Sequence, residues 1–199
     1  MRDGQATRRR IHAEALRLFV DKGVTETSVR DLTQAAGVAE GTLYRHYASK
    51  DDLVAELFAS NYAALARRLD AVRESPGDFR TRLEAIVAEV CRFYDDEPTL
   101  FRFLLLVQHQ ALPRLTTGGA DPVQVLRGMI EQAIDRREIT LGDAALGTAM
   151  VLGLMLQPAT ALVYGRLDPP FSRFAGDIAA ACWRALNPTP DDDRRGHHA

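Results

Sequence analysis

The sequence predicts an all-α chain of about nine helices, and three observations support this fold class. Apolar residues recur at helical spacing along most of the 199 residues. No run alternates convincingly between apolar and polar residues, and the Asn-Gly dipeptide that favours a β-hairpin is absent. Glycines, prolines and capping residues separate the apolar segments, so each segment is predicted to form one helix.

The first predicted helix covers residues 7–22. Its apolar residues share one face, at i, i+4, i+7 and i+8: Ile11, Ala15, Leu18 and Phe19. Gly23 is predicted to end the helix in the left-handed conformation. The basic run at residues 8–10 lies near the helix start, where the helix dipole disfavours cations. We therefore weigh two interpretations of this run, a phosphate contact and a solvated surface.

Residues 28–47 predict two short helices joined by a tight turn. Thr27 is a suitable N-cap for the first helix, and Gly37 can adopt the positive φ that the turn needs. The two helices share an apolar back: Val29, Leu32, Val38 and Leu43. Hydrogen-bonding groups and rings occupy the other sides of the second helix: Thr42, Tyr44, Arg45, His46 and Tyr47. A short helix with this pattern is typical of a helix-turn-helix that reads DNA.

The rest of the chain also predicts helices. They are expected at residues 50–74, 79–94, 99–111, 122–137, 143–164 and 171–186. We assign residues 7–49 to a DNA-binding head, 50–186 to a helical body for effector binding and dimerisation, and 187–199 to a disordered tail. The pair His197-His198 in that tail is interpreted as incidental rather than as a metal site.

Composition excludes several other classes of protein. The hydrophobic fraction of 46% is enough for a sizeable core. The net charge is only −2, but the first 50 residues hold nine Lys and Arg against six Asp and Glu. Cys91 and Cys182 are expected as buried thiols, and no metal or cofactor is expected. No stretch is expected to be long and apolar enough to cross a membrane, residues 144–163 being the best candidate, and no secretory signal precedes the head. We therefore expect a cytoplasmic protein.

Residues 7–58 resemble the DNA-binding head of the tetracycline-repressor (TetR) family of bacterial regulators. The resemblance depends on the first helix with Gly23, the segment 27–32, Ala36-Gly37-Val38, Gly41-Thr42-Leu43-Tyr44, His46-Tyr47, Ser49-Lys50 and Leu53. Thr33 is a departure, because the family pattern usually has alanine there. Threonine is only slightly larger, so we expect a small local adjustment.

The resemblance implies a homodimer that binds a palindromic operator in double-stranded DNA, with each second helix in a major groove. The positions carried over as DNA contacts are Thr27, Ser28, Arg30, Ala39, Gly41, Thr42, Tyr44, Arg45, His46, Tyr47 and Lys50. We expect Tyr47 to bury its ring and expose its hydroxyl, and Lys50 to meet phosphate. Glu40 does not fit a DNA-facing surface, and it is expected either to face solvent or to accept from a cytosine amino group.

The body is expected to form the dimer and to hold a small-molecule effector. The two last helices, 143–164 and 171–186, are the candidates for the dimer interface, because small residues in the first of them let helices approach closely. Tight packing within one subunit is the alternative. The candidates for a ligand pocket are Tyr62, Phe93, Phe103, His109, Met129, Met150, Met155, Gln157 and Trp183. His109 and Gln157 are the most suggestive, because polar groups in apolar helices need partners. Each candidate has plain core packing as its alternative.

Two other functions are weighed against a repressor with a small, largely apolar effector. The first is a DNA-binding regulator without a small-molecule ligand, and activation in place of repression is compatible with the same head. The second is a small helical enzyme. It has little support, because the chain contains no phosphate-binding glycine loop, no metal-ligand spacing and no serine elbow.

Overall fold

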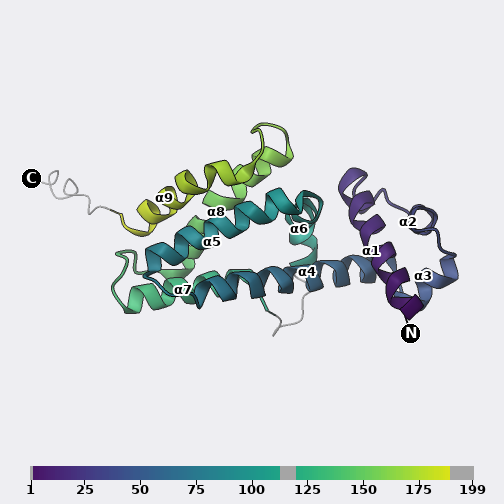
Figure 1. The fold of residues 1–199 in the computed structure, drawn as a ribbon, viewed down its shortest axis with the longest axis horizontal. Helices are drawn as coiled ribbons and strands as arrows, with labels where there is room; N and C mark the ends of the chain where they lie inside the picture. The colour runs from purple at the N-terminus through teal and green to yellow at the C-terminus, as the bar shows by residue number, and fades with distance from the viewer. Residues whose placement is uncertain (1, 113–119, 189–199) are drawn as a thin grey trace, which may run out of the picture. The chain divides into compact units, whose positions relative to one another are not determined.

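The computed structural model describes residues 2–112 and 120–188. Within these ranges it contains nine α-helices, the 3₁₀ helix η2 and no strand, which confirms the predicted all-α class (Figure 1). The elements are α1 (Arg2–Asp21), α2 (Val29–Ala36), α3 (Glu40–His46), α4 (Lys50–Arg73), α5 (Phe79–Asp96), α6 (Pro98–Ala111), α7 (Pro122–Asp135), α8 (Ala144–Val163), η2 (Phe171–Phe174) and α9 (Ala175–Leu186). The predicted tail from residue 189 onward, including His197-His198, lies outside the described residues.

The helices form two compact units. The first unit consists of residues 1–67 and 93–122, and the second of residues 68–92 and 123–199. The functional division at residues 49 and 50 stays a prediction, because the first unit contains α6 as well as the three N-terminal helices.

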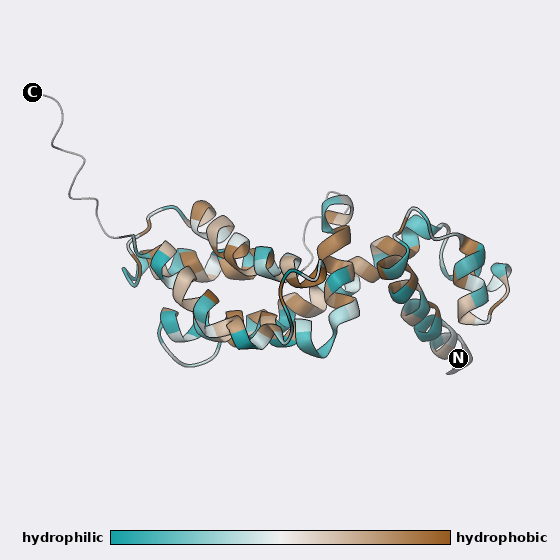
Figure 2. Ribbon diagram, turned by 90° about the horizontal axis from the view of Figure 1, so that it is seen from above, coloured by the Kyte–Doolittle hydropathy of each residue, from teal (hydrophilic) through white to brown (hydrophobic). Residues whose placement is uncertain are grey.

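The core of the first unit is built on α1. The predicted apolar face is buried, with Ile11 and Ala15 at 1% and 0% exposure. This face packs against α2 and α6, and the rings of Phe19 and Phe103 stack with centroids 6.1 Å apart. Figure 2 shows apolar and polar residues mixed along the helices near the N-terminus, as amphipathic helices require.

Two helix starts differ from the sequence prediction. α1 begins at Arg2, ahead of the predicted start at residue 7. The basic run at residues 8–10 therefore lies inside the helix, and the argument from an unfavourable dipole does not apply to it. Residues 171–186 were predicted as one helix, but they form the 3₁₀ turn η2 followed by α9.

The second unit packs α8 closely against α9. Gly147 in α8 permits this approach, because a Cβ there would lie 3.0 Å from a methyl group of Leu186 and 3.1 Å from one of Leu141. The backbone of Leu141 also donates to the carbonyl of Leu186 at 3.0 Å. Part of the small-residue pattern thus serves packing within one subunit, the alternative that the sequence left open.

The expectation that no stretch could cross a membrane by length and composition is wrong for α8. Its 20 residues have a mean hydropathy of 1.6 in the most apolar window, and 33% of that window is buried. One such helix is weak evidence for a membrane span, because the core helix of a soluble protein passes the same test. The finding matters mainly for the apolar surface that α8 exposes.

Candidate nucleic-acid interface

The helix-turn-helix rests on a buried back. Leu32 and Ala36 of α2 and Leu43 of α3 are each at most 1% exposed. Burying a leucine side chain contributes about 2 kcal/mol to the free energy of unfolding, so these residues fix α3 on α2. The turn between the helices is closed by Gly37, whose φ of 60° is the left-handed conformation that a non-glycine residue rarely adopts.

Ser28, rather than Thr27, caps the start of α2. The Ser28 hydroxyl accepts from the backbone of Asp31 at 3.1 Å, and the Asp31 carboxylate accepts from the backbone of Ser28 at 2.9 Å. These two bonds form a capping box. The pKa of Asp31 is lowered below its ordinary 3.8 mainly by the bond from the Ser28 backbone N–H, and next by the Ser28 hydroxyl, which donates to the carboxylate at 2.8 Å.

Thr27 is buried and satisfied within the chain. It is 0% exposed, and its hydroxyl donates to the carbonyl of Gly23 at 2.7 Å. A side chain without accessible surface cannot touch DNA, so Thr27 leaves the set of predicted contacts. Thr33, the departure from the family pattern, is also buried, and its hydroxyl donates to the carbonyl of Arg30 at 3.1 Å. The threonine is therefore accommodated by a local hydrogen bond.

The exposed front carries most of the predicted contacts. Exposed residues of α2, α3 and their caps form this surface: Ser28, Arg30, Ala39, Gly41, Tyr44, Arg45 and His46. Tyr44 is 51% exposed, which is unusual for a large ring. Thr42 is half-buried and accepts from the Arg45 guanidinium at 3.0 Å. A Cβ at Gly41 would meet nothing within 4 Å, so the backbone there is open to a close approach. Glu40 is exposed.

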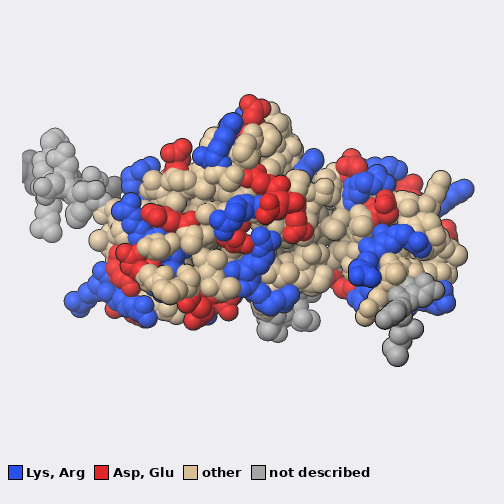
Figure 3. Space-filling model, in the orientation of Figure 1, with Lys and Arg blue, Asp and Glu red and all other residues tan. Residues whose placement is uncertain are grey.

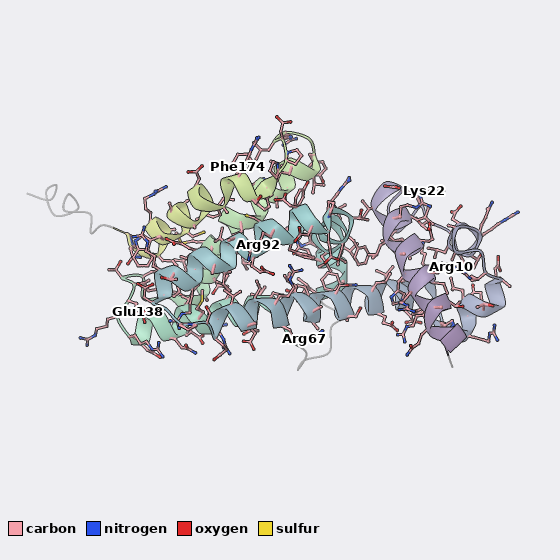
Figure 4. All side chains as sticks on the ribbon, viewed as in Figure 1. Arg10, Lys22, Arg67, Arg92, Glu138 and Phe174 are labelled. Carbon is pink, nitrogen blue, oxygen red and sulfur yellow. The ribbon has the colours of Figure 1, made fainter. Side chains whose placement is uncertain are left out.

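Exposed basic side chains also occur on α1. Arg9 and Arg10 are exposed, and Figure 4 labels Arg10 on α1 together with Lys22 beyond the end of that helix. Figure 3 shows Lys and Arg side chains over this part of the first unit, with Asp and Glu among them. The surface therefore offers several cations without being uniformly basic.

Tyr47 is not an exposed contact. The side chain is 4% exposed, and its hydroxyl is hydrogen-bonded to Nε2 of His12 and accepts from Nε of Arg8 at 3.2 Å. Arg8 also forms an ion pair with Glu56 of α4. We call Arg8, His12, Tyr47 and Glu56 the Tyr47 cluster. The prediction of a buried ring is correct, but the hydroxyl is engaged inside the protein.

Lys50 is likewise engaged inside the protein. Its ammonium donates to the carbonyls of Val24 at 2.7 Å, Thr27 at 2.8 Å and Thr25 at 3.4 Å. An ammonium has three N–H donors, and here each has a carbonyl acceptor. In this arrangement Lys50 ties the first residue of α4 to the turn between α1 and α2 and has no donor left for phosphate.

Comparison with known proteins agrees with this site. The family model described as "Bacterial regulatory proteins, tetR family" matches residues 11–57, which hold the capped turn, α2, α3 and the start of α4. The HTH-type transcriptional regulator AcrR of Shigella flexneri is 27% identical over 167 residues, covering 83% of this chain and 77% of that protein. The chain belongs to the TetR family. It is thus a transcriptional regulator and not an enzyme.

Other relatives extend the likeness in parts. The HTH-type transcriptional repressor KstR2 of Rhodococcus jostii is 37% identical over 73 residues, which span 37% of this chain and only 36% of that repressor. FadR from Bacillus subtilis, solved in complex with stearoyl-CoA, superposes with a TM-score of 0.76 at 17% identity, over 89% of this chain and 98% of FadR.

NalD of Pseudomonas aeruginosa, the secondary repressor of the MexAB-OprM multidrug efflux pump, has a TM-score of 0.74 at 24% identity, over 94% and 99% of the two chains. At such identities FadR and NalD show a shared fold with this TetR-family chain.

The predicted pocket residues of this TetR-family chain do not share one environment. His109 and Gln157 are exposed, so the argument that they need buried partners is wrong. Phe93, Phe103, Met129 and Met155 are buried, whereas Tyr62, Met150 and Trp183 are half-buried. The Tyr62 hydroxyl donates to Asp121 at 3.2 Å, and burial raises its pKa above the ordinary 10.0. The first unit contains Tyr62, Phe93 and Phe103; the second contains Met129, Met150, Met155 and Trp183.

Sequence reasoning missed the polar residues beneath the front. Arg8, His12 and Glu56 are separated from Tyr47 along the chain, and no motif spacing links them. Only the polar identity of His12 beside the apolar face of α1 gave a signal. For metals, no group of three or more His, Cys, Asp or Glu that could hold an ion occurs within residues 2–112 and 120–188.

Proposed function

We propose that this chain is a dimeric, ligand-responsive repressor that binds a palindromic DNA operator and is released by a small, largely apolar effector. The observation that carries the DNA-binding part is the exposed front of α3 above a buried back. A rigid helix with outward-facing hydrogen-bonding groups suits the major groove of DNA. A chain with this role would work in the cytoplasm.

Contacts on the front divide into two kinds. Arg45 and Thr42 lie one helical turn apart and already touch each other at 3.0 Å, so together they present donors and a methyl group to base edges. Arg30, Ser28, Tyr44 and His46 surround them and would contact phosphate or flanking bases, with Arg9 and Arg10 adding charge from α1. The open backbone at Ala39 and Gly41 allows the DNA to come close.

An exposed face of α8 supports dimerisation. Exposed residues recur along one side of this apolar helix and at the residue that follows it: Leu146, Ala149, Gly153, Gln157 and the C-cap Tyr164. Leu146 and Tyr164 are 49% and 62% exposed, an unusual loss of burial for large apolar side chains. A second copy of α8 would cover this face, and a two-fold dimer would match a palindromic operator.

The dimer can be tested at Gly153. A Cβ at Gly153 would meet nothing within 4 Å in one subunit, so Gly153→Glu leaves the fold of the subunit intact. Sedimentation should show a dimer for the wild-type chain and a monomer for Gly153→Glu. Gln124→Glu, an exposed change in α7, is the matched control and should stay dimeric. A monomeric wild-type chain at concentrations that bind DNA contradicts the dimer.

Effector binding rests on the buried aromatic and methionine side chains of the body and on the fold shared with FadR, which was solved with stearoyl-CoA. The shared fold with NalD, a repressor of an efflux pump, supports repression. A regulator without a small-molecule ligand is the second candidate, favoured by the exposure of His109 and Gln157.

The main experiment is a gel shift with labelled DNA from the region upstream of the chain's own gene, in a salt series. Specific binding should weaken steeply as salt rises, because phosphate contacts release counterions. Arg45→Ala should change which sequence is preferred, whereas Arg9→Ala should weaken binding to all sequences. If neither substitution changes the affinity or the preferred sequence, the assigned DNA-binding surface is wrong. Small apolar compounds that never reduce binding favour the candidate without a ligand.

A further inference from the structure

The Tyr47 cluster joins three helices directly beneath the DNA-reading surface. Tyr47 follows α3, and its backbone N–H donates to the carbonyl of Leu43 at 3.0 Å, so it ends the last turn of that helix. Its hydroxyl meets His12 and Arg8 of α1, and Arg8 is paired with Glu56 of α4. One side chain thus connects the end of α3 to α1 and, through Arg8, to α4.

The hydrogen bonds limit where the protons of the cluster can lie. Arg8 can only donate, so the Tyr47 oxygen accepts from its Nε–H. The single Tyr47 proton can then be donated either to Nε2 of His12 or to the carboxylate of Glu56. An imidazole nitrogen accepts only in the neutral ring, with the other nitrogen protonated. A hydrogen bond from Tyr47 to His12 therefore requires a neutral His12.

The surroundings of His12 favour this neutral form. The ring is half-buried, and loss of solvation is the largest cause that lowers the pKa of His12 below its ordinary 6.5. Three charged or titratable neighbours also act on it: Glu56 raises the pKa, whereas Arg8 and His46 lower it. The fourth neighbour is the hydroxyl of Tyr47.

We propose that the Tyr47 cluster positions α3 for DNA, and that uptake of a proton by His12 releases it. Protonation turns Nε2 from an acceptor into a donor, so it can no longer accept from Tyr47. The Glu56 carboxylate, 3.6 Å from Nε2, then becomes its partner. Tyr47 loses His12 as an acceptor, and the end of α3 is then held only through Arg8 and Glu56. This inference rests on the proposed DNA-binding function.

The expected direction separates this mechanism from general electrostatics. Acid ordinarily strengthens DNA binding, because added positive charge attracts phosphate. The exposed side chain of His46 on α3 is therefore replaced by glutamine in the test below. Release of Tyr47 instead weakens binding as the pH falls below the ordinary pKa of histidine. His12, Tyr47 and Glu56 are therefore positioning residues with a recognisable pH profile.

The experiment uses the full chain with a duplex selected from a random-sequence pool. Fluorescence anisotropy follows the dissociation constant from about pH 8 to about pH 5 at constant ionic strength, in a His46→Gln background. We expect affinity to fall about fivefold on acidification, as for the loss of one hydrogen bond. Tyr47→Phe should flatten the profile, and Glu56→Gln should move its midpoint to lower pH. Tyr44→Phe, which removes an exposed hydroxyl, should keep the profile.

Affinity that stays constant or rises with acid in the His46→Gln background overturns the proposal, as does an unchanged profile in Tyr47→Phe. If no duplex is selected at any pH, the DNA-binding function itself fails. The hydrogen bond between Tyr47 and His12 is then tested by NMR titration of His12. Its pKa must rise in Tyr47→Phe, because the Tyr47 proton stabilises the neutral ring, and an unchanged pKa overturns the arrangement.

Discussion

The front and the underside of the helix-turn-helix use the same kinds of side chain in opposite ways. On the front, Tyr44 and Arg45 reach into solvent. Beneath it, the polar groups of Tyr47 and Lys50 form hydrogen bonds within the protein. The two sets are close in sequence, and all four residues were predicted as DNA contacts from the resemblance to the family. The difference teaches that a motif position predicts a residue type, whereas its role depends on which acceptors the fold brings within reach.

The largest effect is expected from the apolar back. Leu43→Ala should lower the free energy of unfolding by about 2–5 kcal/mol, because Leu43 is 0% exposed and its removal leaves a cavity. Tyr44→Ala, one residue away and 51% exposed, should change it by about 0.5 kcal/mol or less. Urea unfolding followed by circular dichroism measures both. Equal losses would mean that front and back are not distinct.

Lys50 gives the sharpest test of the underside. Lys50→Met should lower the free energy of unfolding by about 2 kcal/mol, because bonds from a charged donor are lost. The slope of DNA affinity against salt should not change, whereas loss of a phosphate contact would reduce it by about one. Lys22→Met is the matched control. The Lys22 side chain is half exposed, and its Nζ forms a weak ion pair with Oδ1 of Asp31 at 3.5 Å, so the free energy of unfolding should change by about 0.5 kcal/mol or less. A reduced salt slope in Lys50→Met would mean that Lys50 does contact phosphate, as the sequence predicted.

The capping box should have a smaller effect. Ser28→Ala should cost about 1 kcal/mol of unfolding free energy, as for other N-caps. It should raise the pKa of Asp31 only part of the way toward 3.8, because the Ser28 backbone N–H, the largest cause of the shift, remains. Because the folded pKa of Asp31 is lowered, its contribution to stability is present above about pH 4 and disappears as the pH falls through the folded value. NMR titration of Asp31 checks the shift. An unaltered pKa in Ser28→Ala would show that the Ser28 hydroxyl does not contribute to the shift.

The smallest effect on stability is expected at Thr42. Thr42→Val removes the acceptor of the exposed Arg45 bond, so the free energy of unfolding should change by about 0.5 kcal/mol or less. The preferred DNA sequence should change, because both side chains of the pair would be rearranged. Selection from a random pool with each protein compares the preferences. If both proteins select the same sequence, Thr42 and its bond to Arg45 do not take part in reading the DNA.

Local signals in the sequence accounted for most of the fold. Helical periodicity placed the buried face of α1, and Gly23 and Gly37 adopt the positive φ that their positions predicted. These features depend on neighbours a few residues away, which the sequence displays directly. Helix starts were less accurate, because capping depends on side-chain geometry: Ser28 and Thr27 are both good caps, and the structure uses the former.

The candidate site was predicted only in part, since its underside depends on contacts between distant residues. Nothing near Lys50 in the sequence indicates the three carbonyls 23 to 26 residues earlier in the chain. The same holds for Glu56 and Arg8. His109 and Gln157 illustrate the converse error, because a polar residue among apolar ones suggested burial where the helix in fact turns it outward.

The anchoring of Lys50 also bears on chemical labelling of the protein. The chain contains two lysines, Lys22 and Lys50. The Lys22 side chain is 50% exposed, whereas the Lys50 amine is surrounded by the carbonyls that hold it. An amine must lose its proton and face the reagent before it can be acylated, so Lys22 should react well before Lys50. A fluorophore carried on an activated ester would therefore attach beside the turn that follows α1, leaving the start of α4 unmarked.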